Sequence, residues 1–365
     1  MKKLKIGLVF GGRSSEHEVS LVSARSIYEA LDKKRYNVTL IRINKRGLWY
    51  IIEPHKFRLS PRVSENKQLL PGGKTIIMAA DKKMLYPIRS EDVKKLSQID
   101  VFFPIVHGTF GEDGCLQGFL EMLGAAYVGS GVAGSALGMD KDLMKKVLRD
   151  AGINIARFYT LRQKDVKPKN ISFIIKDLKF PIFVKPANLG SSVGVSKART
   201  KKELNRAIKV ASQYDNKIIL EECIKGREIE CSVLGNEKPI ASLPGEIKLK
   251  PGHFYSYHAK YIDELVATPT PRADLPKNII KKIQETAIKV FKVLNCEGMG
   301  RVDFFLTPKG RLYVNEINTL PGFTNISMYP KMFEESGIPY PKLLDKLIAL
   351  AIERKKRNDK LKRSY

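Results

Sequence analysis

The strongest constraint on the fold is an alternation of buried strands, glycine turns and amphipathic helices in the first third of the chain. Residues 4–12 read LKIGLVFGG, a run typical of a buried strand that ends in two glycines. Apolar residues then recur at helical spacing as far as Leu31, and a second strand is expected over 37–44. A further strand is expected over 99–106, before another glycine-rich turn. This alternation predicts a doubly wound, mostly parallel sheet that extends to about residue 130.

The pattern changes in the middle of the chain. A helix is expected over 141–151, with Gly152 as its left-handed cap. Short strands are expected at 181–185, 193–195, 218–222 and 228–234, and a lysine-rich helix at 203–212. In the remainder we expect a polar loop at 251–271, an amphipathic helix at 276–294, and strands at 301–306 and 311–317. A C-terminal helix follows, and we expect its end to fray in a basic run. Since 365 residues correspond to two or three domains of about 150 residues, we expect the domains 1–135, 136–232 and 233–365.

Composition excludes some classes of protein. Hydrophobic residues make up 43 % of the chain and charged residues 28 %, so a packed core is possible and a mainly disordered chain is excluded. Lys and Arg total 65 against 38 Asp and Glu, a net charge of +27 that attracts phosphates, acidic metabolites or nucleic acid. Because the lysines are spread along the chain, we expect a solvated basic surface and no nucleic-acid partner. A nucleic-acid-binding protein with a concentrated cationic face stays open as the alternative from another class.

Cysteine spacing and hydropathy indicate the compartment. The four cysteines show no CxxC or Cys/His spacing, so neither a disulfide framework nor a zinc site is expected. The apolar stretch 6–10 is too short for the core of a signal peptide. The longest uncharged stretch, 122–139, contains five glycines and two serines, and we expect loops around short elements there rather than a membrane span. A cytoplasmic protein without a membrane partner is expected.

Two glycine turns follow strands of the predicted N-terminal sheet. The first, GGRSSEHEVS at 11–20, opens a helix, where backbone N–H groups favour an anion. It lacks the GxGxxG spacing, and the second strand ends in Ile43 and Asn44 rather than in an acid, which disfavours a nicotinamide dinucleotide. Glu16 in this turn either has a functional role or complements the helix N-terminus. The second turn, HGTFGEDG at 107–114, repeats the composition, and both turns are expected to converge at one edge of the sheet.

A glycine-rich loop in the middle of the chain favours phosphate binding. The sequence KPANLGSSVGVSK places Lys185 at the end of a strand, before Gly190, Ser191, Ser192 and Gly194. Such a tip can bend over a polyphosphate with its backbone N–H groups. It is not a Walker loop, because no GKS or GKT follows. A structural hairpin is the alternative.

Two C-terminal motifs favour a metal-assisted phosphate site. In GRVDFF, Arg301 and Asp303 are two apart on a strand and share a face, and Glu316 and Asn318 do the same in VNEIN. If the strands pair, three oxygen donors and a guanidinium face one place. Carboxylate and amide oxygens are what Mg²⁺ on nucleotide phosphates needs. A surface salt bridge of Arg301 with an acid is the alternative.

Eight motifs in order resemble the D-alanine–D-alanine ligase family of the ATP-grasp superfamily. They are GGRSSEHEVS, HGTFGEDG, MDK at 139–141, VKPANLGSSVGVSK, EECIKGREIECSVLG, FYSYHAKY, GRVDFF and VNEINTLPGFTNISMYP, and the match runs from Ile6 to about Ile352. The resemblance implies an α/β and α+β ATP-grasp fold with an N-terminal doubly wound, Rossmann-like domain. It also implies ligation of two D-alanines through an acyl phosphate, with release of ADP and phosphate, for peptidoglycan precursor synthesis. Another amino-acid or hydroxy-acid ligase that uses the same chemistry is the alternative.

The resemblance also implies roles for residues at matching positions. Glu16 would bind the ammonium of the first D-alanine, and Ser191 and Tyr261 would close the site by hydrogen bonds. Arg301 and the backbone N–H of Gly322 would stabilise the tetrahedral intermediate. His107, Ser327 and Met328 would bind substrate, the last two through the carboxylate of the second D-alanine. Tyr261 argues for an amine acceptor over D-lactate.

The remaining implied roles concern ATP and metal. Lys141, Lys185 and Lys260 would bind phosphates; Glu221, Cys223 and Ile224 would meet adenine; and Glu228 would meet the ribose. Asp303, Glu316 and Asn318 would hold two Mg²⁺ ions, or Mn²⁺. A loop over about residues 248–263 is expected to order over the nucleotide. The resemblance further implies a homodimer.

Overall fold

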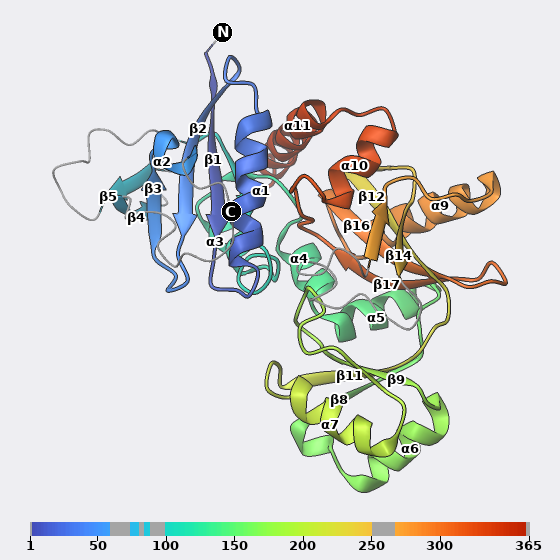
Figure 1. Cartoon of the computed structure of the whole chain (residues 1–365). Helices are drawn as coiled ribbons and strands as arrows, with labels where there is room; N and C mark the ends of the chain where they lie inside the picture. Colours follow the sequence, from blue (N-terminus) through green and yellow to red (C-terminus); the bar gives the residue numbers. More distant parts are fainter. Residues whose placement is uncertain (1, 59–73, 80–83, 88–98, 250–266, 363–365) are drawn as a thin grey trace.

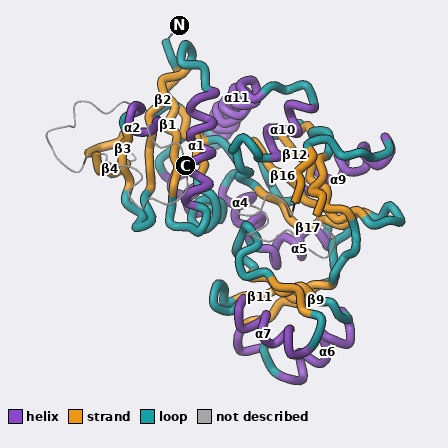
Figure 2. Tube along the Cα trace, in the orientation of Figure 1, coloured by secondary structure: helices purple, strands orange, loops and turns teal. Residues whose placement is uncertain are grey.

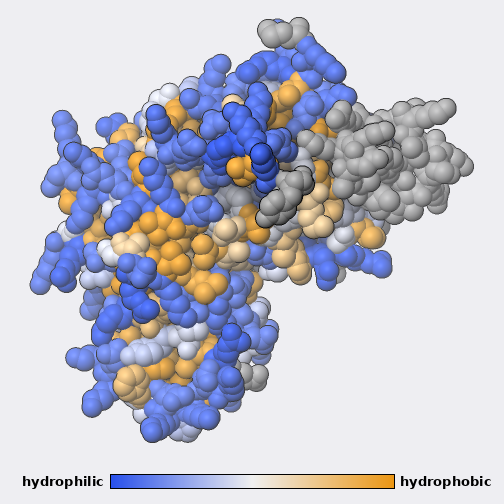
Figure 3. Space-filling model, turned by 180° about the vertical axis from the view of Figure 1, so that it is seen from behind, coloured by the Kyte–Doolittle hydropathy of each residue, from blue (hydrophilic) through white to orange (hydrophobic). Residues whose placement is uncertain are grey.

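The computed structural model describes residues 2–58, 74–79, 84–87, 99–249 and 267–362. These residues form three β-sheets with helices packed on them (Figures 1 and 2). No helix among them is long and apolar enough to span a membrane. Hydrophilic side chains cover much of the face seen from behind, with apolar patches between them (Figure 3).

The first sheet has the strand order β5-β4-β3-β2-β1-β6-β7. The parallel part comprises β1 (Leu4–Gly11), β2 (Tyr36–Ile43), β6 (Val101–Ile105) and β7 (Ala126–Tyr127). The antiparallel extension comprises β3 (Trp49–Ile52), β4 (Lys74–Ala79) and β5 (Met84–Pro87). The doubly wound parallel sheet is therefore confirmed for its four central strands, but the extension was not predicted. Its start is local: the Asn44 side chain accepts backbone N–H bonds from Arg46 and Leu48, and this tight turn can only join antiparallel strands.

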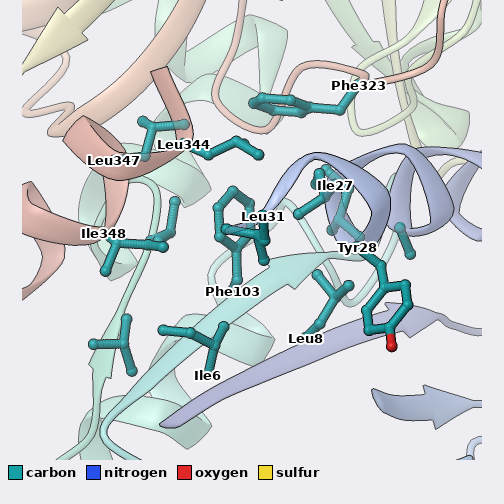
Figure 4. Packing of buried hydrophobic residues seen from close by; sticks show 14 of the residues in the cluster. Ile6, Leu8, Ile27, Tyr28, Leu31, Phe103, Phe323, Leu344, Leu347 and Ile348 are labelled. Carbon is teal, nitrogen blue, oxygen red and sulfur yellow. The ribbon is translucent and has the colours of Figure 1, made fainter. Parts of the chain in front are cut away.

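Helices cover both faces of this sheet. On one face, α1 (His17–Ala30) and the C-terminal helix α11 (Tyr340–Asn358) share a core with β1 and β6. Figure 4 shows Ile6, Leu8 and Phe103 of the sheet beside Ile27 and Leu31 of α1 and Leu344, Leu347 and Ile348 of α11. On the other face, α3 (Cys115–Met122) buries Leu116 and Leu120. A short helix, α2 (Pro54–Arg58), adds Phe57 to the first core.

The second sheet is antiparallel, in the order β10-β9-β11-β8. Its strands are β8 (Phe158–Arg162), β9 (Ile182–Pro186), β10 (Ser196–Ala198) and β11 (Lys217–Glu222). A 3₁₀ turn (Gln163–Asp165) leads to α6 (Pro168–Leu178), and α6 and α7 (Lys201–Ala211) bury one face. The strand expected at 193–195 begins later, because Ser191, Ser192 and Gly194 take up positive φ angles and form a turn.

The third sheet is antiparallel and contains β15-β14-β12-β16-β17, with β13 paired to β12. Its strands are β12 (Arg227–Gly235), β13 (Ile240–Ala241), β14 (Gly245–Leu249), β15 (Ala267–Thr270), β16 (Gly298–Leu306) and β17 (Leu312–Asn318). The amphipathic helix α9 (Lys277–Val293) covers one face, together with α5 (Lys141–Asp150), and α10 (Met328–Glu335) contacts β12. The expected domain boundary at residue 232 lies inside β12, so the chain changes sheet between Glu222 and Arg227.

One local expectation is confirmed and two need correction. The stretch 122–139 contains two short elements, β7 and α4 (Val132–Met139), joined by loops, and a Cβ at Gly134 would lie 2.6 Å from the backbone oxygen of Asn295. Its glycines therefore serve a close approach of helix and chain. Part of the expected 251–271 loop is strand β15. The C-terminal helix does not dissolve into the basic run but continues to Asn358, because Lys355 and Arg357 suit a helix C-terminus and pair with Asp359 and Glu297.

Candidate active site

Glu16 is the point where the first sheet meets the glycine-rich loop of the second. It is the N-cap residue of α1, and it is buried. The Ser191 hydroxyl donates a hydrogen bond to Glu16 Oε1. A Cβ at Gly108 would lie 3.0 Å from Glu16 Oε2 and one at Gly190 3.2 Å, so bare backbone flanks the carboxylate on two sides. The two glycine turns of the first sheet thus converge, and the glycine-rich loop reaches the same place.

Beside Glu16 lies a buried pair, His107 and Glu112. His107 Nδ1 is 3.1 Å from the carbonyl oxygen of Leu320, so it carries a proton, and it is 3.3 Å from Glu112 Oε1. Burial opposes the charge on His107, but the Glu112 carboxylate outweighs it and raises the pKa of the imidazole. Burial, with repulsion from Glu16, raises the pKa of Glu112 to about 7. Glu112 was not singled out in the sequence, although it lies in the HGTFGEDG turn that was.

The second and third sheets face each other through polar side chains. Ile182 and Val184 of β9 and Ile218 and Leu220 of β11 pack under α6 and α7. Because strand residues alternate between faces, Lys185 and Glu221 point from the opposite face. Lys185 Nζ lies 2.8 Å from Glu221 Oε2 and 3.1 Å from Asn315 Oδ1 of β17.

A fully buried lysine of α5, Lys145, completes this group, and the sequence did not reveal it. Lys145 Nζ donates to Glu221 Oε1 at 2.8 Å. Burial opposes the charge of Glu221, but the two ammonium groups outweigh it and lower the pKa of the carboxyl. Glu221 is therefore held as a carboxylate between Lys145 and Lys185.

The predicted pairing of the two C-terminal motifs is confirmed. Asp303 on β16 lies opposite Glu316 on β17, and Arg301 lies opposite Asn318. Both alternatives for Arg301 are partly met. Its side chain shares a strand face with Asp303, and its guanidinium also donates two hydrogen bonds of 2.7 Å to the Asp303 carboxylate. Glu230 of β12 is 3.3 Å from the same guanidinium. The Arg301 and Asp303 side chains are each only 14 % exposed, so this is not a surface salt bridge.

Lys141, at the start of α5, links this face to the glycine-rich loop. Its Nζ is 3.2 Å from Glu316 Oε2 and donates to the Leu189 carbonyl at 2.7 Å. A chain of contacts therefore runs from Glu16 through residues 189–191 to Lys141 and Glu316. It joins all three sheets.

The donor chemistry of this face fits a hard divalent cation. Asp303, Glu316 and Asn318 offer carboxylate and amide oxygens, the ligands that Mg²⁺ prefers. Asn318 Oδ1 accepts the backbone N–H of Leu320, and Arg301 and Lys141 provide the positive charge beside the two acids. In the described part of the chain, no group of three His, Cys, Asp or Glu side chains is arranged as a metal cage. The oxygen set therefore suits an ion that also binds phosphate oxygens and water.

The last motif ends at the N-terminus of α10. Ser327 is the N-cap residue, and its hydroxyl accepts the backbone N–H of Thr324 at 2.9 Å. A Cβ at Gly322 would lie 2.8 Å from Ser327 Oγ, so a larger residue here would displace this hydroxyl. The Met328 side chain is buried with Ile247 and Met332. Of Met328, only the backbone N–H at the helix start is suited to a ligand.

The other predicted residues divide into two groups. Cys223 and Ile224 are half-buried in the turn between β11 and β12, and Glu228 is half-buried on β12. Tyr261 and Lys260 lie outside the described residues, as does most of the expected 248–263 loop.

Comparison with known proteins gives the family. A family profile described as D-ala D-ala ligase N-terminus matches residues 5–130, and one described as D-ala D-ala ligase C-terminus matches residues 147–349. The chain is 50 % identical over 369 residues to the D-alanine–D-alanine ligase of Oceanobacillus iheyensis, covering 100 % of this chain and 99 % of that one.

Solved structures agree with this match. The D-alanine–D-alanine ligase from Coxiella burnetii has a TM-score of 0.85 at 43 % identity, covering 99 % of this chain and 97 % of that one. The ligase from Bacillus anthracis complexed with ATP has a TM-score of 0.71 at 28 % identity, covering 97 % and 99 %. The expected ATP-grasp fold is thereby confirmed. The chain belongs to the D-alanine–D-alanine ligase family.

Proposed function

We propose that this enzyme joins two D-alanine molecules while ATP is converted to ADP and phosphate, and that the dipeptide serves peptidoglycan synthesis. Family membership supports this activity, and a relative solved with ATP supports the nucleotide. The observation that carries the proposal is the chain of contacts Glu16–Ser191, Leu189–Lys141 and Lys141–Glu316. It brings a carboxylate suited to an ammonium group next to lysines and acids suited to a metal-bound polyphosphate.

The first step activates a carboxylate. An oxygen of the first D-alanine carboxylate forms a bond to the γ-phosphorus, and the bond from that phosphorus to the bridging oxygen of ADP breaks. Glu16 binds the substrate ammonium and so orients the attacking carboxylate. Lys141 and Lys185 bind phosphate oxygens and offset their charge. Asp303, Glu316 and Asn318 would hold Mg²⁺, which would supply further positive charge to the phosphates.

The second step forms the peptide bond. The amine of the second D-alanine attacks the acyl carbon, and the carbon–oxygen bond to phosphate breaks. The proton that the nitrogen loses passes to the departing phosphate or to water. Arg301, which pairs with Asp303 and Glu230, and the backbone N–H of Gly322 would stabilise the negative oxygen of the tetrahedral intermediate. The Ser327 hydroxyl and the Met328 N–H at the start of α10 suit the carboxylate of the second substrate. His107, whose pKa is raised by Glu112 against the effect of burial, would be the titratable group on this side.

The base and ribose complete the nucleotide site. Glu221, Cys223 and Ile224 lie at the end of β11 and in the turn that follows, where an adenine edge would meet them. Glu228, the second residue of β12, would meet the ribose hydroxyls. Tyr261 and Lys260 would act from the loop that closes over the substrates.

The test is a product assay with purified protein, ATP, Mg²⁺ and D-alanine. We expect D-alanyl-D-alanine by chromatography and one phosphate released per dipeptide, with at least about tenfold less product from D-serine or D-lactate as second substrate. Loss of activity in a chelator should be restored by Mg²⁺. No phosphate release above background with D-alanine would contradict the proposal. Efficient release with another acceptor would favour the alternative ligase.

The rest of the organisation follows from the same proposal. We propose three domains, as expected at 1–135, 136–232 and 233–365, but with the second boundary at 222–227, where the chain changes sheet, and with the nucleotide between the second and third. The enzyme acts in the cytoplasm, where ATP is available and the buried thiols of Cys231 and Cys296 stay reduced. It acts as a homodimer, which light scattering of the purified protein tests.

A further inference from the structure

Lys145 is a charged side chain that the proposed reaction leaves without a role. It lies on α5 with a side chain 0 % exposed, one of the largest fully buried side chains of the described chain. Lysines are almost never buried this completely unless they are paired. Its partner is Glu221, 76 residues later, on β11 of the second sheet. Lys145 therefore ties α5 to the strand that carries the nucleotide residues.

Lys145 and Lys185 bind the same carboxylate, but only the Lys185 side chain has room to move. Each is 2.8 Å from its own oxygen of Glu221. The Lys185 side chain is 11 % exposed and has a second partner, the Asn315 amide on β17, whereas the ring of Phe158 lies 5.8 Å from Lys145 Nζ. Lys185 can thus turn toward a ligand between the sheets. Lys145 is enclosed.

The second partner of Lys185 exists because of an irregularity in β17. Asp303 pairs with Glu316, but the next residue, Phe304, pairs with Val314, so Asn315 is an extra residue in a β-bulge. Strict alternation would turn Asn315 away from the face that holds Glu316, and a bulge re-aims such a side chain. In the structure the amide reaches Lys185 across the gap between the two sheets.

We propose that Lys145 is a positioning residue of the nucleotide site. It stays on Glu221 as a permanent counter-ion when Lys185 moves from Glu221 to a phosphate of the nucleotide. Without Lys145, that movement would leave a buried carboxylate without a positive partner, which is strongly unfavourable. Lys185 would then be retained by Glu221 and withheld from the phosphate. This inference rests on the proposed use of ATP.

The direct test replaces Lys145 by methionine and measures nucleotide binding. Calorimetry with a non-hydrolysable ATP analogue gives the Kd without D-alanine, and steady-state kinetics give KM and kcat. We expect Lys145→Met to raise the Kd and the KM for ATP by about tenfold or more, with kcat and the KM for D-alanine within about threefold of the wild type. Lys145→Arg, which keeps the charge, should recover most of the affinity.

The matched control is Lys146→Met, the next residue of α5. Its side chain is 49 % exposed and pairs with Asp142. It should leave the Kd for ATP unchanged. A Lys145→Met protein that melts at a lower temperature but binds the analogue with the wild-type Kd would overturn the proposal, because Lys145 would then only stabilise the fold.

A second measurement applies even if Lys145→Met does not fold. Burial, with repulsion from Lys185, lowers the pKa of Lys145 against the attraction of Glu221 and Glu316. Arginine stays charged at every accessible pH. The loss of ATP-analogue affinity on raising the pH should therefore begin at a higher pH in Lys145→Arg than in the wild type, and an unchanged alkaline limit would overturn the proposal. Binding of the ATP analogue is measured without turnover. A failure of the ligase assay, which tests the proposed function, can therefore be told apart from a failure of the proposal for Lys145.

Discussion

Glu112 and Glu221 are both buried carboxyl groups, yet their pKa values are shifted in opposite directions. Burial, with the nearby charge of Glu16, raises the pKa of Glu112 to about 7. Glu221 is more deeply buried, at 2 % exposure against 9 % for Glu112, but Lys145 and Lys185 outweigh the cost of burial and lower its pKa. Depth alone therefore does not decide the protonation of a carboxyl group; the charges that touch it do. The proposed amino-acid side of the site has a carboxyl group with a raised pKa, and the proposed nucleotide side has a carboxylate between two lysines.

The largest expected difference between Glu221 and Glu112 is in how much each contributes to the free energy of unfolding. Glu221→Gln would leave Lys145 and Lys185 buried without their shared partner, and we expect a loss of about 3 to 5 kcal/mol in the free energy of unfolding. Glu112→Gln resembles the protonated form and should change it by less than about 1 kcal/mol. Urea denaturation of both variants at neutral pH measures this. Equal losses would show that burial depth, not the neighbouring charges, controls these groups.

The next largest effect is expected on the use of D-alanine. Loss of the Ser191–Glu16 contact should weaken it without changing ATP binding. Ser191→Ala removes a hydrogen bond to a charged group, worth about 1.5 to 3 kcal/mol, so kcat/KM for D-alanine should fall by roughly ten- to a hundredfold. The Kd for ATP should stay close to that of the wild type. Ser196→Ala, on β10 of the same sheet, is the control and should leave both values unchanged. An equal loss in ATP affinity would mean that the two sides are not separate.

The smallest expected effect is a pH dependence of stability. The folded protein binds the Glu112 proton more tightly than the unfolded chain does. This proton therefore stabilises the folded state fully below pH 4.5, the ordinary pKa of the group, and the stabilisation is lost as the pH rises through about 7. The raised pKa of His107 adds a loss in the same direction above its ordinary value of 6.5. The melting temperature of the wild type relative to Glu112→Gln should therefore fall from about pH 5 to about pH 8. Glu221 acts in the opposite sense, since its stabilisation is lost as the pH falls through its lowered pKa. A difference independent of pH would contradict the assignment to Glu112.

Residues placed by local periodicity were predictable from the sequence. Arg301 and Asp303, and Glu316 and Asn318, share a face because strand side chains alternate, and the structure pairs these strands in register. Gly152 follows α5 with φ of 67°, as its position predicted. These features depend only on residues near in sequence. The same is true of the helices α1, α5, α7 and α9.

Residues placed by distant contacts were not predictable. Lys145 lies in the run KDLMKK, which resembles a solvated helix face, and only its contact with Glu221 shows otherwise. The bulge that turns Asn315 toward Lys185 breaks the alternation on which the prediction of that strand depended. Met328 was assigned to substrate by its motif, but its side chain packs in a core formed with Ile247 of β14. In each case the deciding partner is far away in the sequence.

The position of α11 affects how the chain is made. This helix packs against β6 and β7, and its Leu344, Leu347 and Ile348 complete a core begun by Ile6 and Leu8 (Figure 4). The ribosome synthesises those first strands early, and the leucines that cover them some three hundred residues later. At about 5 to 20 residues per second, the part of this apolar face that α11 covers, and α1 does not, stays exposed for tens of seconds during translation. Until α11 is synthesised, the nascent chain therefore exposes apolar side chains to which chaperones can bind.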